Sequence, residues 1–525
     1  MKAVAEDAEA TSEADEDEAL HHGSARAVLI WFRSANGQRF LGWLAILIPL
    51  LVWAAAMWPA VMVADSKDSW NQAVVGPVNE WHKPTYTYVQ RLSHVLVGSP
   101  WGVTVLQCGL MAWAVRRLLD VAVLVGARRW LLYGFGAFVA LTPPVGAFTV
   151  QLIKDVPYAI AFLVVMEFVG KEVAARYLHR SAQQDHMIRR TILLFLGLAG
   201  LALMRQNGSL VLVGSAVAAV FVSRHWRLAA AAGFSALVLS ITLSSLVYPA
   251  VGVVESPQRS SSAPFGLAVR TLFADRPEDV PEYVVPSLEL HGSQAEYAEL
   301  YNCHWAGSEF QPRLYQPKPV DRSAIRRAWF EAFRDDPLFI TGAHLCAASP
   351  AWNPIATEEE QAYYQTVWDV VVENPQGLVS DPLSDLLGDY ARRLLRFVGL
   401  TNHSDKAWNP VVSQLVLWRA PTYVYLLAAG LLVAGIRYGR WRALWLLVPF
   451  VAQAASVIIL GGPHYRYMAP AWIGSVLLLP LAWKLSTRGR LGQRIIQTDP
   501  GAGTGQHDAS ACRGGHSQRR LTSTQ

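Results

Sequence analysis

The stretch FLGWLAILIPLLVWAAAMWPAVMV, residues 40–63, decides the fold class of this chain. It contains no charged side chain. A helix needs about 20 consecutive, mainly apolar residues to cross the hydrocarbon core of a bilayer. The stretch therefore predicts a membrane-spanning helix, and the polar residues that follow it, beginning at Asp65, are predicted to lie at the membrane surface.

Apolar runs of this kind recur along the chain. Hydrophobic residues make up 52% of the sequence and charged residues only 16%, whereas about a quarter of the residues in a soluble domain are charged. The predicted fold class is an all-α polytopic membrane protein with a bundle of about ten transmembrane helices. The runs are residues 40–63, 102–119, 130–148, 156–170, 191–204, 210–222, 228–247, 422–436, 443–460 and 468–483.

Charge, cysteine content and motifs exclude several classes of protein. The 45 Lys and Arg against 40 Asp and Glu give a net charge of +5, which is too small and too dispersed for nucleic-acid binding. Four cysteines in 525 residues do not build a disulfide scaffold. The chain has no Walker loop, HExxH, GxSxG or paired CxxC motif, which argues against nucleotide-driven, zinc-dependent and serine-hydrolase chemistry.

Basic residues collect in alternate loops, and cytoplasmic loops are the ones enriched in Lys and Arg. We therefore expect both termini to lie in the cytoplasm, in a bacterial cell membrane, and residues 64–100, 149–155, 205–209, 248–421 and 461–467 to face outside. The basic loops hold Arg116, Arg117, Arg128, Arg129; Lys171, Arg176, Arg180, Arg189, Arg190; Arg224, Arg227; Arg437, Arg440, Arg442; Lys484, Arg488, Arg490 and Arg494.

The same boundaries predict the domain organisation. The N-terminal tail is acidic at residues 6–18, unlike a cleavable signal peptide, which begins with basic residues. The predicted parts are a disordered acidic cytoplasmic tail (1–39), an N-terminal transmembrane catalytic module (40–248) with its first outer loop (64–100), a mostly helical extracytoplasmic lobe (249–412), C-terminal transmembrane helices (413–484) and a disordered cytoplasmic tail (485–525).

The predicted lobe contains two cysteines, Cys303 and Cys346. Two thiols in one extracytoplasmic lobe often pair. Two buried free thiols are the alternative, and the sequence leaves both open.

The first outer loop carries two polar clusters. Asp65 and Asp68 are three residues apart and share one face of a helix, so they suit a general base or a divalent cation; a solvated loop face is the alternative. Trp81 and His82 lie in the same loop. Such aromatic and polar residues suit a sugar or headgroup surface, although interfacial aromatic residues are common in any membrane protein.

Three further outer segments each carry a cation: Lys154 next to Asp155, Arg205 close to Asn207, and Arg466 between His464 and Met468. Guanidinium and ammonium groups suit a phosphate. Interfacial ion pairs and a snorkelling arginine are the plain alternatives. Together, acids on one loop and cations on others at one membrane face suit a lipid phosphate and a hydroxyl acceptor.

The order of these motifs resembles the GT-C glycosyltransferases, integral-membrane enzymes that use polyprenyl-phosphate sugars. The resemblance is to a bacterial branch similar to the protein mannosyltransferases (family 39), and it spans roughly residues 40–484. The motifs are Asp65-Ser66…Gln72, Trp81-His82-Lys83-Pro84, Lys154-Asp155-Val156-Pro157, Arg205-Gln206-Asn207-Gly208 and Arg466-Tyr467-Met468-Ala469-Pro470.

This resemblance implies a GT-C-like bundle and an inverting transfer of a hexosyl or pentosyl unit to a glycan, lipid or protein hydroxyl at the outer face of the bilayer. Asp65 would be the catalytic base, with Asp68 as second choice. The roles of the remaining candidates follow the same resemblance. Lys154, Arg205 and Arg466 would hold the phosphate, Asp155 would orient Lys154 or contact the acceptor, Trp81 and His82 would line the sugar site, and Gln72, Asn207, His464 and Tyr467 complete the substrate-binding set.

No cofactor is certain from the sequence. A divalent metal stays possible, and Asp65 and Asp68 are the residues that would hold it. Three other functions stay open: an envelope glycan polymerase or ligase, a transporter or flippase for a lipid-linked or anionic solute, and a non-catalytic assembly protein. A transporter places its ionisable residues near mid-membrane on broken helices, whereas these candidates lie at one edge.

Overall fold

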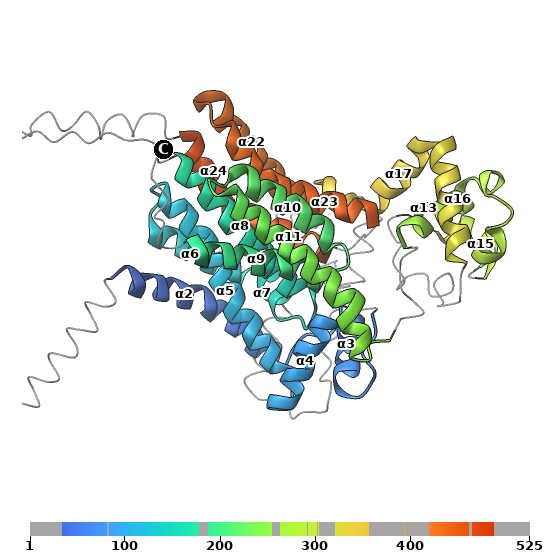
Figure 1. The fold of residues 1–525 in the computed structure, drawn as a ribbon, viewed down its shortest axis with the longest axis horizontal. Helices are drawn as coiled ribbons and strands as arrows, with labels where there is room; N and C mark the ends of the chain where they lie inside the picture. The colour runs from blue at the N-terminus through green and yellow to red at the C-terminus, as the bar shows by residue number, and fades with distance from the viewer. Residues whose placement is uncertain are drawn as a thin grey trace, which may run out of the picture. The chain divides into compact units, whose positions relative to one another are not determined.

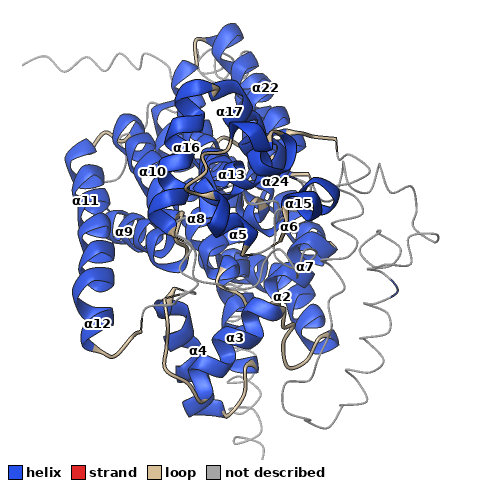
Figure 2. Ribbon diagram, turned by 90° about the vertical axis from the view of Figure 1, so that its right-hand side faces the viewer, coloured by secondary structure: helices blue, strands red, loops and turns tan. Residues whose placement is uncertain are grey.

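The computed structural model describes residues 34–80, 83–177, 187–254, 263–290, 292–301, 303, 321–355, 393, 419–460 and 465–487. Over these residues every regular element is a helix, as Figure 2 shows. Extended pairing there is confined to two isolated bridges, Val61 with Gln151 and Asn79 with Val254. The prediction of an all-α protein is confirmed for this part of the chain.

The described helices up to Ser486 follow one another along the sequence and belong to one unit (Figure 1). The elements that concern the site are α2 (Ala35–Ala56), α3 (Ala64–Val74), α4 (Pro84–Val97), α5 (Trp101–Leu124), α6 (Arg129–Leu141), α7 (Pro143–Thr149), α8 (Asp155–Tyr177), α9 (Met187–Met204), α10 (Gly208–Val222), α11 (Trp226–Thr242), η2 (Leu243–Val247), α12 (Tyr248–Ala250), α22 (Ala420–Tyr438), η7 (Trp441–Leu447), α23 (Val448–Leu460), η8 (Tyr465–Tyr467) and α24 (Ala469–Thr487).

Six helical segments among the described residues are long and apolar enough to cross a membrane. The number rises to eight if two bent pairs, α4 with α5 and α6 with α7, each count as one span. A multi-pass membrane protein is thus supported, but the predicted count of ten is not confirmed. The two remaining runs lie in α8, which carries Glu167, Lys171 and Glu172, and in α10, which has only 15 residues.

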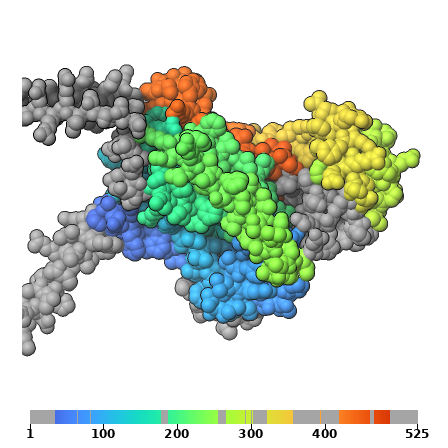
Figure 3. Space-filling model, in the orientation of Figure 1, coloured from blue at the N-terminus to red at the C-terminus, as the bar shows by residue number. Residues whose placement is uncertain are grey.

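The outer faces of these helices are apolar, as a lipid-facing surface requires. Figure 3 shows the length of α11 and α12, in green, on the surface of the molecule. Phe234 on α11 is 70% exposed and Leu246 on η2 is 66% exposed. Apolar surface of this extent is avoided in water and is expected against lipid.

Helix α8 lies at the centre of the packing. It is buried along almost its whole length and packs against α5 and α9. Two glycines of α9 permit the close approach, because a Cβ atom at Gly197 would lie 2.9 Å from Val165 and one at Gly200 would lie 2.8 Å from Ala161. Small residues let membrane helices approach in this way.

The first predicted span ends earlier than expected. The helix was predicted over residues 40–63, but α2 ends at Ala56 and the Trp58–Pro59 peptide bond is cis. Proline has no N–H and disfavours helical geometry in the residue before it. The backbone of Val61 pairs instead with Val150 and Leu152, which places the start of α3 beside the segment that leads into α8.

A second hydrophobic cluster lies in the described part of residues 263–355, which is also helical. Helices α13 (Ala263–Asp275), α15 (Gln294–Leu300) and α16 (Arg322–Asp335) enclose Phe273, Tyr297 and Ile325. Cys303 and Cys346 form a disulfide bond, the first of the two alternatives that the sequence left open.

Candidate functional site

Four of the predicted charged residues meet in one chain of alternating charge. The Nη2 atom of Arg466 lies 2.7 Å from Oδ2 of Asp65, and its Nε lies 3.8 Å from Oδ2 of Asp155. The Oδ1 atom of Asp155 lies in turn 3.0 Å from Nη1 of Arg205. We call Asp65, Arg466, Asp155 and Arg205 the ion-pair chain. Its members come from four separate segments, which meet at one end of α8.

Asp65 is the accessible end of the ion-pair chain. It lies in the first turn of α3, where a negative charge interacts favourably with the helix dipole. Its side chain is 29% exposed, against 1% for Asp155 and 6% for Arg205. A reactant that comes from outside the protein can therefore reach Asp65 far more easily than Asp155.

Asp68 has different partners from Asp65. Its Oδ2 atom accepts a hydrogen bond of 2.8 Å from Gln72, and the Oε1 atom of Gln72 accepts one from the backbone of Asn79. Burial raises the pKa of Asp68, and the nearby charge of Asp65 raises it further, while Gln72 and Lys154 act in the opposite direction. Asp68 is exposed, and its bond to Gln72 is a contact within α3, at the edge of the ion-pair chain.

Arg205 is held between aromatic rings and a carboxylate. It lies between α9 and α10, and its guanidinium carbon is 4.1 Å from the centre of the Tyr467 ring and 5.5 Å from that of Tyr158. A buried charge needs a partner of opposite sign, which Asp155 supplies, and the ring faces add cation–π attraction. These contacts fix the guanidinium in one position.

A buried glutamine connects this site to α8. The Oε1 atom of Gln453, on α23, accepts a hydrogen bond of 2.5 Å from the Tyr158 hydroxyl, and its Nε2 donates one of 2.6 Å to the carbonyl oxygen of Tyr467. Gln453 is fully buried. It therefore ties α8 to the short turn that carries Arg466. Sequence reasoning missed Gln453 and Tyr158; the available signal was a lone amide within an apolar run, since buried polar groups need partners.

Lys154 lies beside the ion-pair chain and is partly buried. Burial lowers the pKa of its ammonium group, whereas the charges of Asp65 and Asp155 raise it. With Lys154 and Asp68 included, three cations and three carboxylates gather at this end of α8, so their formal charges balance. The three cations come from separate segments, and each is a potential partner for a phosphate oxygen.

The other candidates divide into two groups. Asn207 donates a hydrogen bond of 2.9 Å from Nδ2 to Ser456, which joins the start of α10 to α23, and Tyr467 packs against Arg205. Trp81, His82 and His464 lie outside the described residues. For a metal, the described part of the chain shows no group of three or more His, Cys, Asp or Glu side chains placed to bind one.

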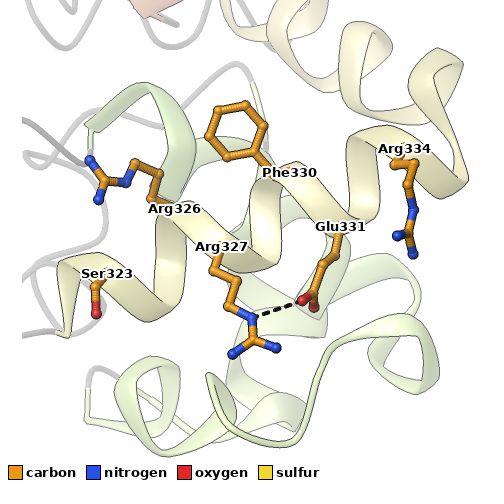
Figure 4. Close-up of a pocket in the computed structure, with 6 residues that line it drawn as sticks. All are labelled: Ser323, Arg326, Arg327, Phe330, Glu331 and Arg334. Atoms are coloured by element: carbon orange, nitrogen blue, oxygen red, sulfur yellow. Dashed lines mark hydrogen bonds and ion pairs between the residues drawn. The ribbon is translucent and has the colours of Figure 1, made fainter.

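A surface hollow on α16 is separate from these residues. It is lined by Ser323, Arg326, Arg327, Phe330, Glu331 and Arg334. Figure 4 shows that these side chains diverge: Arg327 and Glu331 pair on one side at 2.9 Å, while Arg326 and Phe330 point elsewhere. The polar groups do not converge on a common point, as they do in a ligand pocket.

Comparisons with protein-family models, with curated proteins and with solved structures find no match to this chain. The class that fold and site define is a helical, multi-pass membrane protein with alternating acids and arginines gathered at one end of its central helix.

Proposed function

We propose that this protein is a membrane glycosyltransferase that transfers a hexosyl or pentosyl unit from a polyprenyl-phosphate donor to a hydroxyl of a cell-envelope glycan, lipid or protein. The observation that carries the proposal is the contact between the accessible carboxylate of Asp65 and the guanidinium of Arg466, next to Asp155 and Arg205. The reaction needs a base for the acceptor and cations for the phosphate. The motif order shared with the GT-C glycosyltransferases supports the same function.

In the proposed step, the acceptor oxygen attacks the anomeric carbon as the bond from that carbon to the phosphate oxygen breaks. Asp65 takes the proton of the acceptor hydroxyl. The departing lipid phosphate keeps the bonding electron pair, and Lys154, Arg205 and Arg466 stabilise its growing negative charge. Displacement from the opposite face inverts the configuration of the sugar.

Donor binding and base release are coupled in this mechanism. The guanidinium of Arg466 lies 2.7 Å from the carboxylate of Asp65. A donor phosphate competes for the same guanidinium, because phosphate is a strong partner for arginine. Phosphate binding therefore frees the Asp65 carboxylate to approach the acceptor, and Asp155 continues to hold Arg205.

The position of the charges argues for a surface reaction over transport. The ion-pair chain lies at the first turn of α8, whereas transporter sites lie near the membrane midplane. The Lys and Arg distribution supports an outer location for this end and a cytoplasmic location for both termini. A polymerase or ligase that uses a lipid-linked glycan would share this chemistry, and donor identity separates it from the proposed enzyme.

The proposal is tested with purified protein in nanodiscs, radiolabelled polyprenyl-phosphate sugars and a membrane acceptor fraction. Asp65→Asn is compared with Asp68→Asn, a matched change three residues away on the same helix. Loss of a general base lowers a rate by about 100-fold or more, so we expect transfer to disappear in Asp65→Asn and to persist in Asp68→Asn.

Either of two results would overturn it. Folded Asp65→Asn protein that transfers sugar at the wild-type rate removes Asp65 as the base. Wild-type protein that neither binds nor consumes any of several polyprenyl-phosphate sugars removes the transferase function, and favours the transporter or the assembly protein.

A further inference from the structure

The end of α8 away from the ion-pair chain carries a second group of charges. Glu172 follows Asp155 by seventeen residues on this helix, a separation of about 26 Å at 1.5 Å per residue. The hydrocarbon core of a bilayer is about 30 Å thick. The two charged groups therefore belong to opposite membrane edges.

Arginines from three elements meet at this second edge. Arg176, near the end of α8, donates hydrogen bonds of 2.6 Å to the carbonyl oxygen of Val222 and 3.1 Å to that of Ser223. Arg224 follows directly in the chain. Arg440, just before η7, lies 4.7 Å over the ring of Tyr177, and this contact brings the start of η7 to the same place.

The arginines at this edge repel one another. The positive charges of Arg442, on η7, and of Arg224 both act on Arg176. The carboxylate that acts on Arg176 is Glu172, whose Oε1 is already bound by Arg190 at 2.6 Å. Four guanidiniums and one carboxylate leave these five residues with a net charge of +3.

We propose that Arg176, Arg224 and Arg442 form a binding site for the phosphate of an anionic phospholipid at the membrane edge opposite the ion-pair chain. Arg224 and Arg442 are exposed and Arg176 is partly exposed, so a headgroup can reach all three. Guanidinium groups bind phosphate through paired hydrogen bonds. Basic pockets between membrane helices attract anionic headgroups for this reason.

Two tryptophans flank the arginines and fix the depth of the site. Trp226, at the start of α11, is 54% exposed, and Trp441, at the start of η7, is 52% exposed. Exposed indole rings favour the headgroup level of a bilayer. The arginines next to them in the chain therefore lie where lipid phosphates lie, which favours a lipid over a soluble phosphate.

The site is tested by native mass spectrometry of the purified full-length protein with added phosphatidylglycerol, and with zwitterionic phosphatidylcholine for comparison. Arg224→Gln/Arg442→Gln removes two exposed charges. Arg326→Gln/Arg334→Gln removes the same number from α16 and serves as the matched control. We expect the first variant to lose phosphatidylglycerol binding by roughly tenfold or more, at about 1 kcal/mol per charge, and the control to keep it.

The proposal is overturned if both variants lose lipid equally, because net charge alone then explains binding, or if Arg224→Gln/Arg442→Gln binds as the wild type does. Inorganic phosphate and glycerol 3-phosphate are the soluble probes. If they displace the lipid at similar concentrations, the arginines bind soluble phosphate instead. Both variants must have the elution volume and the Tm of the wild type. The test does not depend on transferase activity.

Discussion

Arg466 binds Asp65 across 401 positions of the sequence, with Nη2 lying 2.7 Å from Oδ2. The Nε atom of the same guanidinium lies 3.8 Å from Oδ2 of Asp155. One arginine therefore contacts both the accessible carboxylate and the buried one. A ligand that engages Arg466 changes the electrostatic environment of both acids at once.

Replacing Arg466 tests this double role. Arg466→Gln is expected to lower the initial rate of sugar transfer by about 100-fold or more, because a charge that stabilises the leaving phosphate is lost. Arg466→Lys keeps the positive charge but not the contact with both carboxylates. Its transfer rate should therefore lie between those of the wild type and Arg466→Gln. Exposed Arg227→Gln is the control, and a wild-type rate in Arg466→Gln would contradict the assignment.

The buried pair of Asp155 and Arg205 should dominate stability at this end of α8. Asp155→Asn leaves a buried guanidinium without its 3.0 Å partner, which costs about 3–5 kcal/mol of unfolding free energy. The double variant with Arg205→Gln removes both charges and should cost less than the sum of the single changes. Denaturant unfolding in detergent micelles measures the cycle, and strictly additive costs would show that the two residues do not interact.

The disulfide between Cys303 and Cys346 closes a loop of 43 positions. Such a link restricts the unfolded chain and is expected to stabilise its part of the fold by about 2–4 kcal/mol. Dithiothreitol should therefore lower the Tm of the wild type but leave Cys303→Ser/Cys346→Ser unchanged. Equal sensitivity of the two proteins to the reductant would exclude a stabilising role.

Asp68 predicts a pH dependence of stability. Its pKa is raised in the folded protein, first by burial and also by Asp65. A carboxyl whose pKa is raised on folding destabilises the folded state when it is ionised. This effect is absent well below pH 3.8, where the carboxyl is protonated in both states, and it is complete once the pH has risen through the folded pKa. Asp68→Asn should therefore raise the Tm slightly at pH 7 and leave it unchanged well below pH 3.8. A Tm gain that persists at low pH would contradict this origin.

The apolar runs predicted the helices well because the requirement to face lipid acts on every residue of a span. The breaks were harder to predict. Helices α4 and α5 meet at a bend of 118°. The bend lies at Gly98, whose φ of +67° ends α4, and at Pro100, which precedes α5. In the sequence these residues lie just before the predicted run at residues 102–119, and nothing local shows that helix direction reverses there.

The charged members of the site were predictable individually, because a charge near hydrocarbon is costly and stands out in an apolar sequence. Their partners were not. The pairing of Asp155 with Arg205 and Arg466 depends on how α8, α9 and α24 pack. The bridge of Val61 to Gln151, which brings Asp65 to that place, likewise depends on contacts far apart in the chain.

Gln453 is a positioning residue within the apolar helix α23, and its role is hard to predict from the sequence. Its amide joins the Tyr158 hydroxyl to the Tyr467 carbonyl. Gln453→Leu therefore leaves the buried Tyr158 hydroxyl without its partner, at a cost of about 1–3 kcal/mol, and also removes the partly buried bond to Tyr467. The turn that carries Arg466 is then less well fixed, and a misplaced contact of this kind lowers kcat by roughly 10- to 100-fold. Tyr158→Phe removes one of the two bonds and should have an intermediate effect.

The control for Gln453 is Ser475→Ala, which removes a buried hydroxyl that bonds only within its own helix, to the carbonyl of Trp472. That change should lower the Tm and leave kcat unchanged. If Gln453→Leu behaves in the same way, with lower stability but a wild-type kcat, Gln453 serves packing alone. If kcat falls while KM for the donor stays constant, Gln453 acts through Arg466 on the transition state. A contact that stabilised the bound donor and the transition state equally would raise KM when lost and leave kcat unchanged.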